Sequence, residues 1–522
     1  MSETIIQESE ISQLTMDIVL SSAAARWGDK TYLHDLETDR RYTYQDIDVI
    51  STTMARNLRA IGIGKGTHVA LLMGNSADLL LLYLALARVG AVAAPINPEA
   101  PARLMAYYLD LCEATAVIAD DVCLPALSDA LSQHSLAGPV VVRGAATGNF
   151  VPFSRLYEET ETDQAPFDVR FTDVACLALT SGTTGPSKAV VFTQATMLLV
   201  AKSYAEAFDY RSDDTYYICL PLFHTSGLRG AAWVALLKGG SVALARKFSV
   251  SRFWDDIHRS QATTFDLLGA MISFLWQAPA HPLERSHRVR MVRVAPVPPY
   301  GREFEERFGV RLVSTYGLTD AAAPVARGLD APDDKFFSCG RLRPGFDLRV
   351  VDADDLQMPP SVTGEIIIRA NTPWLMPSGY YNNSAANAAQ WRNGWFHTGD
   401  LGWLDEDGYL YFAGRAKEVI RRRGQNISAW EVENFLRNIP GVRDCAVYPV
   451  TSPHGEDEVA ASIVLKNPEA GPEVDILQRC REGLLPYMVP EHIEYRTAFP
   501  LTPSQKIDKT ALRREFEARL QS

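Results

Sequence analysis

Short apolar runs alternate with amphipathic stretches over the first 320 residues of the chain. Three such runs between residues 67 and 120 read "THVALLMGN", "AVAAPINP" and "ATAVIAD", and segments with helical spacing of apolar positions separate them. Buried strands that are regularly separated by helices are typical of a parallel sheet covered on both faces. The same pattern returns between residues 241 and 295. This part is therefore predicted to be an α/β domain built from doubly wound sheets.

The pattern changes after Ala321. Segments such as "GEIIIRA" and "GWFHTGDLGWLDEDGYLYFAGR" show short alternating strands with Asp-Gly and Gly-Asp turns and little helix. Such a texture favours a small β-barrel module over about 322–413. Together with the α/β part, it would complete a large N-terminal domain over residues 1–413.

A compact α+β domain is predicted for residues 414–522. An amphipathic helix is expected over 428–439 and another over 474–484, with apolar strands at 442–450 and 458–465. The charged, glycine-flanked junction before them is typical of a linker that lets a small domain move.

Length, charge and cysteine usage narrow the class of protein. A chain of 522 residues needs two or more domains, and its net charge of −12 argues against general affinity for nucleic acid or anionic membrane. Seven cysteines without a C-x-x-C pair favour a reducing compartment. The longest apolar stretch, 77–96, contains Asp78 and Arg88 and is predicted to be a buried helix followed by a strand. Because no signal-peptide pattern is visible, a cytoplasmic location without membrane insertion is expected. A homodimer is left open.

One loop carries the first chemical signal. "LTSGTTGPSK" (179–188) lies between two apolar segments that are predicted to pair as a hairpin. Backbone amides and hydroxyls in such a turn form a nest for phosphate oxygens, and Lys188 would add a positive charge. The spacing differs from the Walker loop, and a strand rather than a helix follows the lysine, so a P-loop kinase is disfavoured. A flexible surface loop is the alternative.

Six signatures in order resemble the adenylate-forming superfamily, which includes acyl- and aryl-CoA synthetases. Besides the loop, they are "LPLFH", "STYGLTD", "WFHTGDLG", "GRAKEVIRRRGQNISAWEVE" and "PLTPSQKIDK". The similarity extends from about residue 42 to 512. Finer features, such as "PYMVPEHIEY", look most like bacterial acid–CoA ligases of the crotonobetaine/carnitine–CoA ligase type. This resemblance does not define the substrate.

The resemblance implies a two-step reaction. A carboxylic acid and ATP would form an acyl-adenylate and pyrophosphate, and coenzyme A would then give acyl-CoA and AMP. The partners implied are therefore a small carboxylic acid, ATP, CoA and Mg²⁺. Attack of one anion on another requires positive charge near the α-phosphate. Lys506 matches the family lysine that supplies it, with a solvated surface lysine as the alternative; Gln505 replaces the usual glycine beside it.

The ATP-binding residues follow from the same resemblance. Thr319 and Asp320 match the residues that contact the α-phosphate and bind magnesium, although most relatives have glutamate in place of Asp320. Asp400 and Arg415 would hold the ribose hydroxyls. The remaining ATP-binding residues expected are Thr180, Ser181, Gly182, Thr183, Thr184, Gly185, Lys188, Ala295 and Tyr316, the last of them against adenine unless it is a core tyrosine.

Two further regions are implied. Lys417 matches the hinge at which the small domain rotates, and Arg421 and Asn426 stand where aryl–CoA ligases have a catalytic lysine and glutamine. His224 would gate the path between acid and thiol, with a structural histidine as the alternative. Gln194 stands where many relatives have a histidine near the phosphates.

The acyl pocket is expected to be lined by one charged and several apolar residues. Arg229 could bind a second carboxylate or polar tail of the acid, but a solvent-facing arginine is the favoured interpretation. The others are Gly269, Met271, Val297 and Leu318. Residue types alone do not name the acid, because an apolar pocket discriminates one methylene by only about 1–3 kcal/mol.

Two other hypotheses stay open. The enzyme could pass its acyl group to a carrier protein or an amine instead of CoA. Alternatively, the departures at Gln194, Asp320 and Gln505 could mark a nucleotide-binding protein that has lost catalysis.

Overall fold

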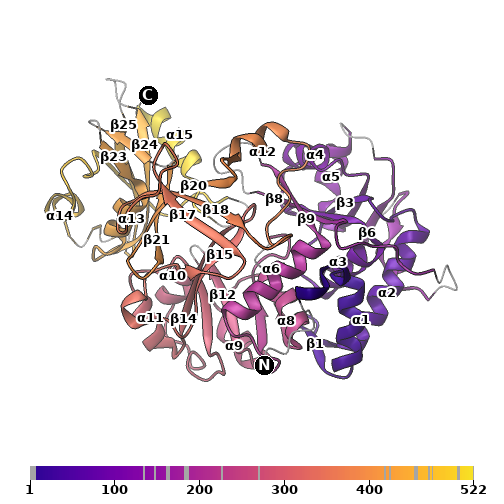
Figure 1. Cartoon of the computed structure of the whole chain (residues 1–522). Helices are drawn as coiled ribbons and strands as arrows, with labels where there is room; N and C mark the ends of the chain where they lie inside the picture. The colour runs from indigo at the N-terminus through magenta and orange to yellow at the C-terminus, as the bar shows by residue number, and fades with distance from the viewer. Residues whose placement is uncertain are drawn as a thin grey trace.

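Two large sheets with flanking helices form most of the molecule, and a smaller segment follows at the C-terminal end (Figure 1). The computed structural model of the chain describes residues 8–132, 136–145, 148–159, 165–180, 187–224, 227–268, 271–416, 419–422, 425–451, 457–467, 469, 471–472, 474–502 and 506–520.

The first sheet contains the predicted N-terminal strands. Its order is β7-β6-β5-β3-β4-β8-β9, and every neighbouring pair is parallel except the last. The bounds are β3 His68–Leu72, β4 Val92–Pro95, β5 Ala116–Asp120, β6 Val140–Arg143, β7 Val151–Pro152, β8 Val174–Leu179 and β9 Ala189–Thr193. The antiparallel β8–β9 pair confirms the hairpin that was predicted around the threonine-rich loop.

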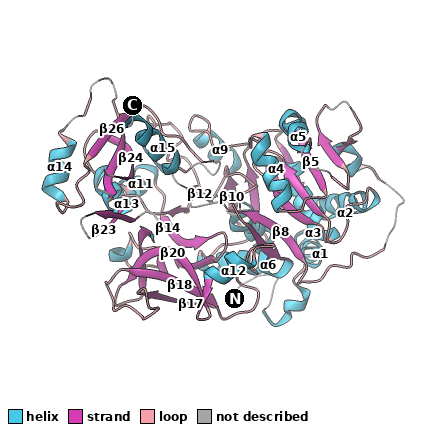
Figure 2. Ribbon diagram, turned by 90° about the horizontal axis from the view of Figure 1, so that it is seen from above, coloured by secondary structure: helices cyan, strands magenta, loops and turns pink. Residues whose placement is uncertain are grey.

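Helices cover both faces of the first sheet. Along β3, Val69 and Leu71 join one apolar cluster, whereas Ala70 and Leu72 join another with α4 (Ala102–Leu111) and α5 (Leu124–Leu131). Side chains of a strand alternate between faces, so both faces are buried. The doubly wound arrangement is confirmed, and Figure 2 shows helices outside the strands.

The second sheet is larger and mixed. Among the described residues it has 14 strands in the order β17-β18-β20-β21-β16-β15-β14-β13-β12-β10-β11-β1-β2, with β19 paired to β20. The bounds are β1 Thr31–Asp35, β2 Arg40–Thr43, β10 Thr215–Ile218, β11 Ser241–Leu244, β12 Thr264–Leu268, β13 Met291–Ala295, β14 Leu312–Leu318, β15 Ala322–Arg327, β16 Gly340–Leu342, β17 Phe346–Val351, β18 Gly364–Ala370, β19 Trp391–Arg392, β20 Trp395–Leu404 and β21 Tyr409–Arg415.

The β-rich module predicted over about 322–413 is joined by hydrogen bonds to the α/β part. Its strands are short and antiparallel, as expected, but their hydrogen bonds continue the α/β sheet. A three-residue turn joins β14 to β15, and the two strands pair antiparallel, with Tyr316 opposite Val325. Since β15 pairs directly with the last parallel strand, the β-rich part extends the edge of the larger sheet.

The helices alternate with these strands. The N-terminal ones not yet bounded are η1 Glu8–Gln13, α1 Met16–Trp27, α2 Tyr44–Ala60, α3 Ala77–Val89, η2 Asp121–Cys123, η3 Phe153–Tyr157, α6 Gln194–Ala207, the π-helical η4 Leu228–Ala232, α8 Trp233–Lys238, α9 Phe253–Ser260, α10 Met271–Gln277, α11 Gly301–Phe308, η5 Asp333–Lys335 and α12 Ser384–Gln390. α2 begins with a capping box, in which Thr43 and Asp46 each bond the other's backbone N–H.

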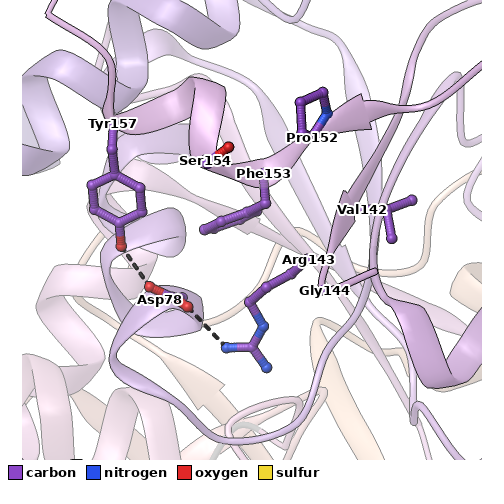
Figure 3. A pocket seen from close by; sticks show the side chains of 8 residues that line it. All are labelled: Asp78, Val142, Arg143, Gly144, Pro152, Phe153, Ser154 and Tyr157. Atoms are coloured by element: carbon purple, nitrogen blue, oxygen red, sulfur yellow. Dashed lines mark hydrogen bonds and ion pairs between the residues drawn. The ribbon is translucent and has the colours of Figure 1, made fainter. Parts of the chain in front are cut away.

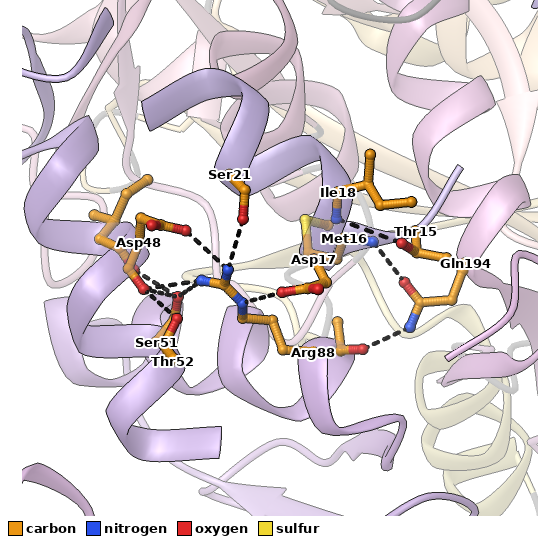
Figure 4. Close-up of polar contacts among 12 residues, drawn as sticks. Thr15, Met16, Asp17, Ile18, Ser21, Asp48, Ser51, Thr52, Arg88 and Gln194 are labelled. Carbon is orange, nitrogen blue, oxygen red and sulfur yellow. Dashed lines mark hydrogen bonds and ion pairs between the residues drawn. The ribbon is translucent and has the colours of Figure 1, made fainter. Parts of the chain in front are cut away.

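The apolar helix α3 is buried with its arginine. Arg88 is 3% exposed, and it forms ion pairs of 2.8 Å with Asp17 of α1 and Asp48 of α2 (Figure 4). A buried charge is tolerated when it is paired in this way, and the pairs join three helices. As expected for the 77–96 stretch, the described part of the chain holds no helix with the length and apolar character to cross a bilayer.

The C-terminal segment forms its own α/β unit. It comprises β22 Val419–Arg422, β23 Gln425–Ser428, α13 Ala429–Arg437, β24 Val442–Thr451, β25 Asp457–Leu465, α14 Ile476–Gly483, β26 His492–Arg496 and α15 Lys509–Leu520. A separate apolar cluster that includes Val432, Val447 and Ile463 forms its core. The unit contacts the large domain where the Gln277 side-chain amide donates to the Arg443 carbonyl, 3.4 Å away.

Candidate active site

Carboxyl ends of neighbouring parallel strands gather the predicted acyl-pocket segments. β10, β12, β13 and β14 lie side by side in that order. His224 follows β10, Ala295 ends β13 and Leu318 ends β14. In open α/β sheets, ligands bind in the crevice outside such ends. The topology therefore places these residues at the end of the second sheet where its parallel strands terminate.

The threonine-rich loop begins and ends at paired residues. The backbone N–H of Lys188 donates to Thr180 Oγ1 at 2.9 Å, and the N–H of Thr180 donates to the Lys188 carbonyl at 3.0 Å. These bonds close the base of the loop at the end of the β8–β9 hairpin. Five of the predicted phosphate-binding residues lie outside the described residues: Ser181, Gly182, Thr183, Thr184 and Gly185.

Asp320 lies in the turn between β14 and β15, beside Thr319, and both residues are partly exposed. Its Oδ2 accepts a hydrogen bond of 2.6 Å from the Tyr380 hydroxyl. The Nζ of Lys188 lies 4.4 Å from the centre of the Tyr380 ring. Tyr380 thus connects the candidate magnesium ligand to the base of the phosphate loop.

Asp400 and Arg415 face each other across the β20–β21 hairpin. They are register partners, and Arg415 Nε lies 3.4 Å from Asp400 Oδ1. The hydroxyl of Tyr316 donates to Asp400 Oδ2 at 2.9 Å. Tyr316 is buried in the main apolar cluster, so its hydroxyl holds the Asp400 carboxylate in a defined orientation from inside the protein. The two residues that the resemblance assigned to the ribose therefore lie side by side.

The charge of Lys506 acts on Asp400. Burial raises the pKa of Asp400 to about 6, while Arg415, the Tyr316 hydrogen bond and the charge of Lys506 act in the opposite direction. The negative charge of Asp320 also raises this pKa. Lys506 belongs to the C-terminal unit, so groups from both parts of the chain meet around Asp400.

The charge of Lys506 also acts on His224. Removal of its ring from water, followed by the positive charges of Lys506 and Arg229, lowers the pKa of His224 to about 4. The imidazole is therefore neutral at physiological pH. A neutral ring can accept or donate a hydrogen bond without repelling a bound cation, as a gating or orienting residue requires.

Arg229 is buried, which corrects the solvent-facing interpretation. The residue is 6% exposed and lies in η4, whose neighbours Leu228 and Ala232 belong to the main core. Its guanidinium carbon lies 3.5 Å from the centre of the Phe192 ring. η4 packs against α6 and β10, so its whole turn is covered. Burial lowers the pKa of Arg229 to about 10, which leaves it charged at neutral pH.

Of the other predicted acyl and hinge residues, some belong to the described part of the chain and others do not. Met271 is buried at the start of α10, and Val297 packs beside the same cluster. Arg421 and Asn426 are directly opposed in the backbone of the β22–β23 hairpin, but only their backbone is described. Gly269, Lys417 and Gln505 lie outside the described residues.

Gln194 points into the protein rather than toward the phosphates. It is 1% exposed, its Oε1 accepts from the Met16 backbone N–H at 3.0 Å, and its Nε2 donates to the Ala87 carbonyl at 2.8 Å (Figure 4). The side chain bridges the starts of α1 and α6 and the end of α3. Its role here is structural, because both halves of the amide are engaged by buried backbone.

We expect Gln194→Ala to reduce stability and leave catalysis intact. The change would leave the buried Met16 N–H without its partner, at a cost of about 1–3 kcal/mol, and would remove the shorter of two hydrogen bonds to the Ala87 carbonyl. Urea unfolding should show a free energy of unfolding lower by about 2–4 kcal/mol, with kcat unchanged for the folded fraction. Gln45→Ala, on the exposed face of α2, is the control. A loss of ATP affinity without a loss of stability would contradict this assignment.

Tyr380 is the site residue that sequence reasoning missed. Its segment pairs with β9, where the Val191 N–H donates to the Gly379 carbonyl at 2.9 Å and the Tyr381 N–H to the Ala189 carbonyl at 2.8 Å. The only local signal is a tyrosine pair after a glycine, "GYYNN". Nothing in that pattern connects it to Asp320, 60 residues away in the chain.

A cavity of about 300 Å³ lies at the β6–β7 edge of the first sheet, whereas the loop that ends at Lys188 connects β8 and β9 at the opposite edge. It is lined in part by Asp78, Arg143 and Tyr157 (Figure 3). Tyr157 donates to Asp78 at 2.6 Å, and Arg143 pairs with Asp78 and with Asp120. Its polar groups already satisfy one another, so we assign it no function.

Comparison with known families agrees with this geometry. A model of the AMP-binding enzyme family matches residues 20–381, well over half of the chain, and a model of the AMP-binding enzyme C-terminal domain matches residues 431–506. The chain belongs to the AMP-binding enzyme family. The two matches fall on the large domain and on the C-terminal unit, respectively.

Individual relatives cover nearly the whole of this AMP-binding enzyme. It is 29% identical to the crotonobetaine/carnitine–CoA ligase of Proteus mirabilis, over 93% of this chain and 98% of the relative. It is 30% identical to the sulfoacetate–CoA ligase of Cupriavidus necator, over 95% and 97%. The structure of o-succinylbenzoate CoA synthetase from Bacillus subtilis, in complex with ATP and magnesium ion, is 25% identical with a TM-score of 0.82, over 95% and 98%. The AMP-binding enzyme is thus an AMP-forming acid–CoA ligase.

Proposed function

We propose that this enzyme condenses a small carboxylic acid with ATP to give an acyl-adenylate and pyrophosphate, and then transfers the acyl group to CoA with release of AMP. The observation that carries the proposal is the meeting of Lys506, from the C-terminal unit, with Asp400 and His224 of the large domain. Such a meeting is what adenylation requires, because attack on the α-phosphate needs positive charge beside that phosphate, in addition to the residues that hold the ribose.

In the first step, a carboxylate oxygen of the acid attacks the α-phosphorus of ATP and the bond to pyrophosphate breaks. The ionised Asp400 would accept both ribose hydroxyls, with Arg415 beside it. Lys506 and Thr319 would neutralise and bind the α-phosphate oxygens as negative charge grows there. The loop from Thr180 to Lys188 would bind the departing pyrophosphate.

The residues present fit a magnesium ion. Among the described residues, no group of three or more His, Cys, Asp or Glu side chains is arranged to hold a metal. A single carboxylate suffices for Mg²⁺, which takes its other ligands from phosphates and water, and the partly exposed Asp320 offers Oδ1 while Oδ2 is held by Tyr380. When bound, Mg²⁺ would neutralise charge on the phosphate oxygens.

In the second step, the CoA thiol attacks the acyl carbon and the bond to AMP breaks. We infer that residues 414–522 rotate as a unit between the two steps about a hinge near Lys417, with residues 1–413 as the fixed part. A separate core cluster in the C-terminal unit supports this division. The rotation would replace Lys506 at the site by the β22–β23 hairpin, which carries Arg421 and Asn426. Neutral His224 would gate the path of the thiol.

The proposal is tested by product analysis over an acid panel. The enzyme is incubated with ATP, Mg²⁺ and short, branched, aryl, anionic-tailed and betaine-type acids, and pyrophosphate release is measured with and without CoA. We expect acid-dependent pyrophosphate with at least one acid and, with CoA present, equal amounts of AMP and acyl-CoA by mass spectrometry. Formation of ADP would contradict the proposal. Pyrophosphate without acyl-CoA would shift the acceptor to an amine or carrier protein.

Tyr380→Phe should weaken the use of magnesium. The hydroxyl orients Asp320, and loss of a residue that orients a metal ligand typically costs about 10–100-fold in metal affinity. We therefore expect the Mg²⁺ concentration for half-maximal adenylation to rise about tenfold or more. The matched control is Tyr381→Phe, which removes a hydroxyl bond of the same length to exposed Glu113. An equal effect of both changes would exclude a specific role of Tyr380.

A further inference from the structure

Arg229 is a buried cation without an acidic partner. Six arginines in the described part of the chain are buried: Arg88, Arg229, Arg293, Arg327, Arg343 and Arg422. Three of them form ion pairs with acids, and Arg327 and Arg343 donate to backbone carbonyls. For Arg229, the described residues provide neither kind of partner, and its guanidinium packs on the face of the Phe192 ring.

A partnerless guanidinium of this kind is costly to retain. Burial of an unpaired charge is unfavourable, and a cation–π contact offsets only part of the cost. A hydrophobic side chain would fill the same space without that cost. The arginine therefore has to be explained by something that binds it.

Arg229 lies five residues after His224 in the chain, and its charge acts on that histidine. It acts on His224 together with the charge of Lys506, so the three groups share one region. Arg229 also lies in η4, a π-helical turn, and such turns are frequent at functional sites. Phe192, which stacks on the guanidinium, is on β9, the strand that leaves the phosphate loop. Two cations, one from each part of the chain, thus act on the neutral histidine.

We propose that Arg229 binds a second negatively charged group, a carboxylate or a sulfonate, at the far end of the acid substrate. The inference rests on the proposed adenylation: Lys506 would serve the carboxylate that reacts, and Arg229 the one that does not. The planar guanidinium can donate two parallel hydrogen bonds to either anion. An acid with a quaternary ammonium tail would be rejected, because it would bring a cation against a buried cation.

The test compares acids that differ only in the charge of the tail. Acid-dependent pyrophosphate release is measured for butyric acid, succinic acid, its monoamide, 3-sulfopropionic acid and 4-(trimethylammonio)butyric acid, with shorter and longer homologues of each. We expect kcat/KM for an anionic-tailed acid to exceed that of its neutral amide by about 100-fold. Comparison of kcat/KM for the carboxylate-tailed and sulfonate-tailed acids then shows which anion is preferred.

Two variants connect the preference to Arg229. Arg229→Met keeps an apolar cover on Phe192 and should reduce the diacid-to-amide ratio of kcat/KM toward about one, with the KM for ATP unchanged. Arg229→Lys keeps the charge and should retain part of the ratio. A wild-type enzyme that prefers neutral or cationic tails would overturn the inference, as would a variant that raises the KM for ATP or CoA instead. Absence of pyrophosphate with every acid would instead refute the adenylation itself.

Discussion

Lys506→Ala is expected to reduce adenylation by about 10²–10³-fold, since the variant loses the charge that Lys506 brings to the site of Asp400 and His224. Removal of one preorganised group that stabilises charge in a transition state has effects of this size. The thioester step, started from chemically prepared acyl-adenylate and CoA, should change by less than about tenfold, because the lysine acts only in the first step. Rapid-quench assays of pyrophosphate and of acyl-CoA measure the two steps separately.

The matched control is Lys509→Ala in the same signature. Lys509 forms an ion pair of 2.8 Å with buried Glu433 inside the C-terminal unit, so its loss affects that unit's stability rather than the α-phosphate. Loss of both steps to the same extent in Lys506→Ala would show that the lysine supports folding or domain orientation instead of the first transition state.

Asp400 should impose a pH dependence on the use of ATP. With its pKa near 6, the carboxyl is protonated at pH 5 and ionised at pH 7. Only the ionised form accepts both ribose hydroxyls, so kcat/KM for ATP should rise with pH and fall about tenfold per unit below pH 6. Initial rates at low ATP between pH 5 and 8 measure this profile.

Asp400→Asn is the control that isolates the carboxyl. It cannot titrate, and it should lower kcat/KM for ATP by about 50–100-fold at pH 8, because an amide presents a donor to Arg415 and to one ribose hydroxyl. ATP's own protonation affects both enzymes alike, so the ratio of wild type to variant should increase with pH and level off above about pH 7. A ratio that is constant over this range would exclude Asp400 as the titrating group.

Local patterns predicted those parts of the fold that local chemistry determines. The β8–β9 hairpin and the β20–β21 hairpin are both specified by apolar runs on either side of turn residues. Because pairing across a short turn follows from the chain itself, the opposition of Asp400 and Arg415 could be foreseen. The alternation of strands and helices likewise predicted the doubly wound first sheet.

Properties that depend on distant parts of the chain were predicted less well. The burial of Arg229 results from the packing of η4 against α6 and β10, which no local pattern reveals. Gln194 occupies a position expected to face phosphates, but its amide is engaged by Met16 and Ala87, whose chain segments reach it only through tertiary packing. Tyr380 was missed for the same reason.

The β-rich part illustrates a further limit. Its turns and short strands correctly predicted antiparallel pairing, but not that these strands continue the hydrogen bonding of the α/β part. The short turn from β14 to β15 makes that connection. Sheet membership is set by partners elsewhere in the chain, so periodicity alone does not determine it.

The central claim is that an organic acid attacks the α-phosphorus of ATP in a site completed by Lys506. Oxygen transfer tests it most directly: the acid that the panel identifies is prepared with 18O in its carboxyl group and converted with ATP and CoA. Since the attacking oxygen stays on phosphorus when CoA takes the acyl group, AMP should carry one 18O atom in its phosphate. AMP without the label, or ADP as the nucleotide product, would contradict the account.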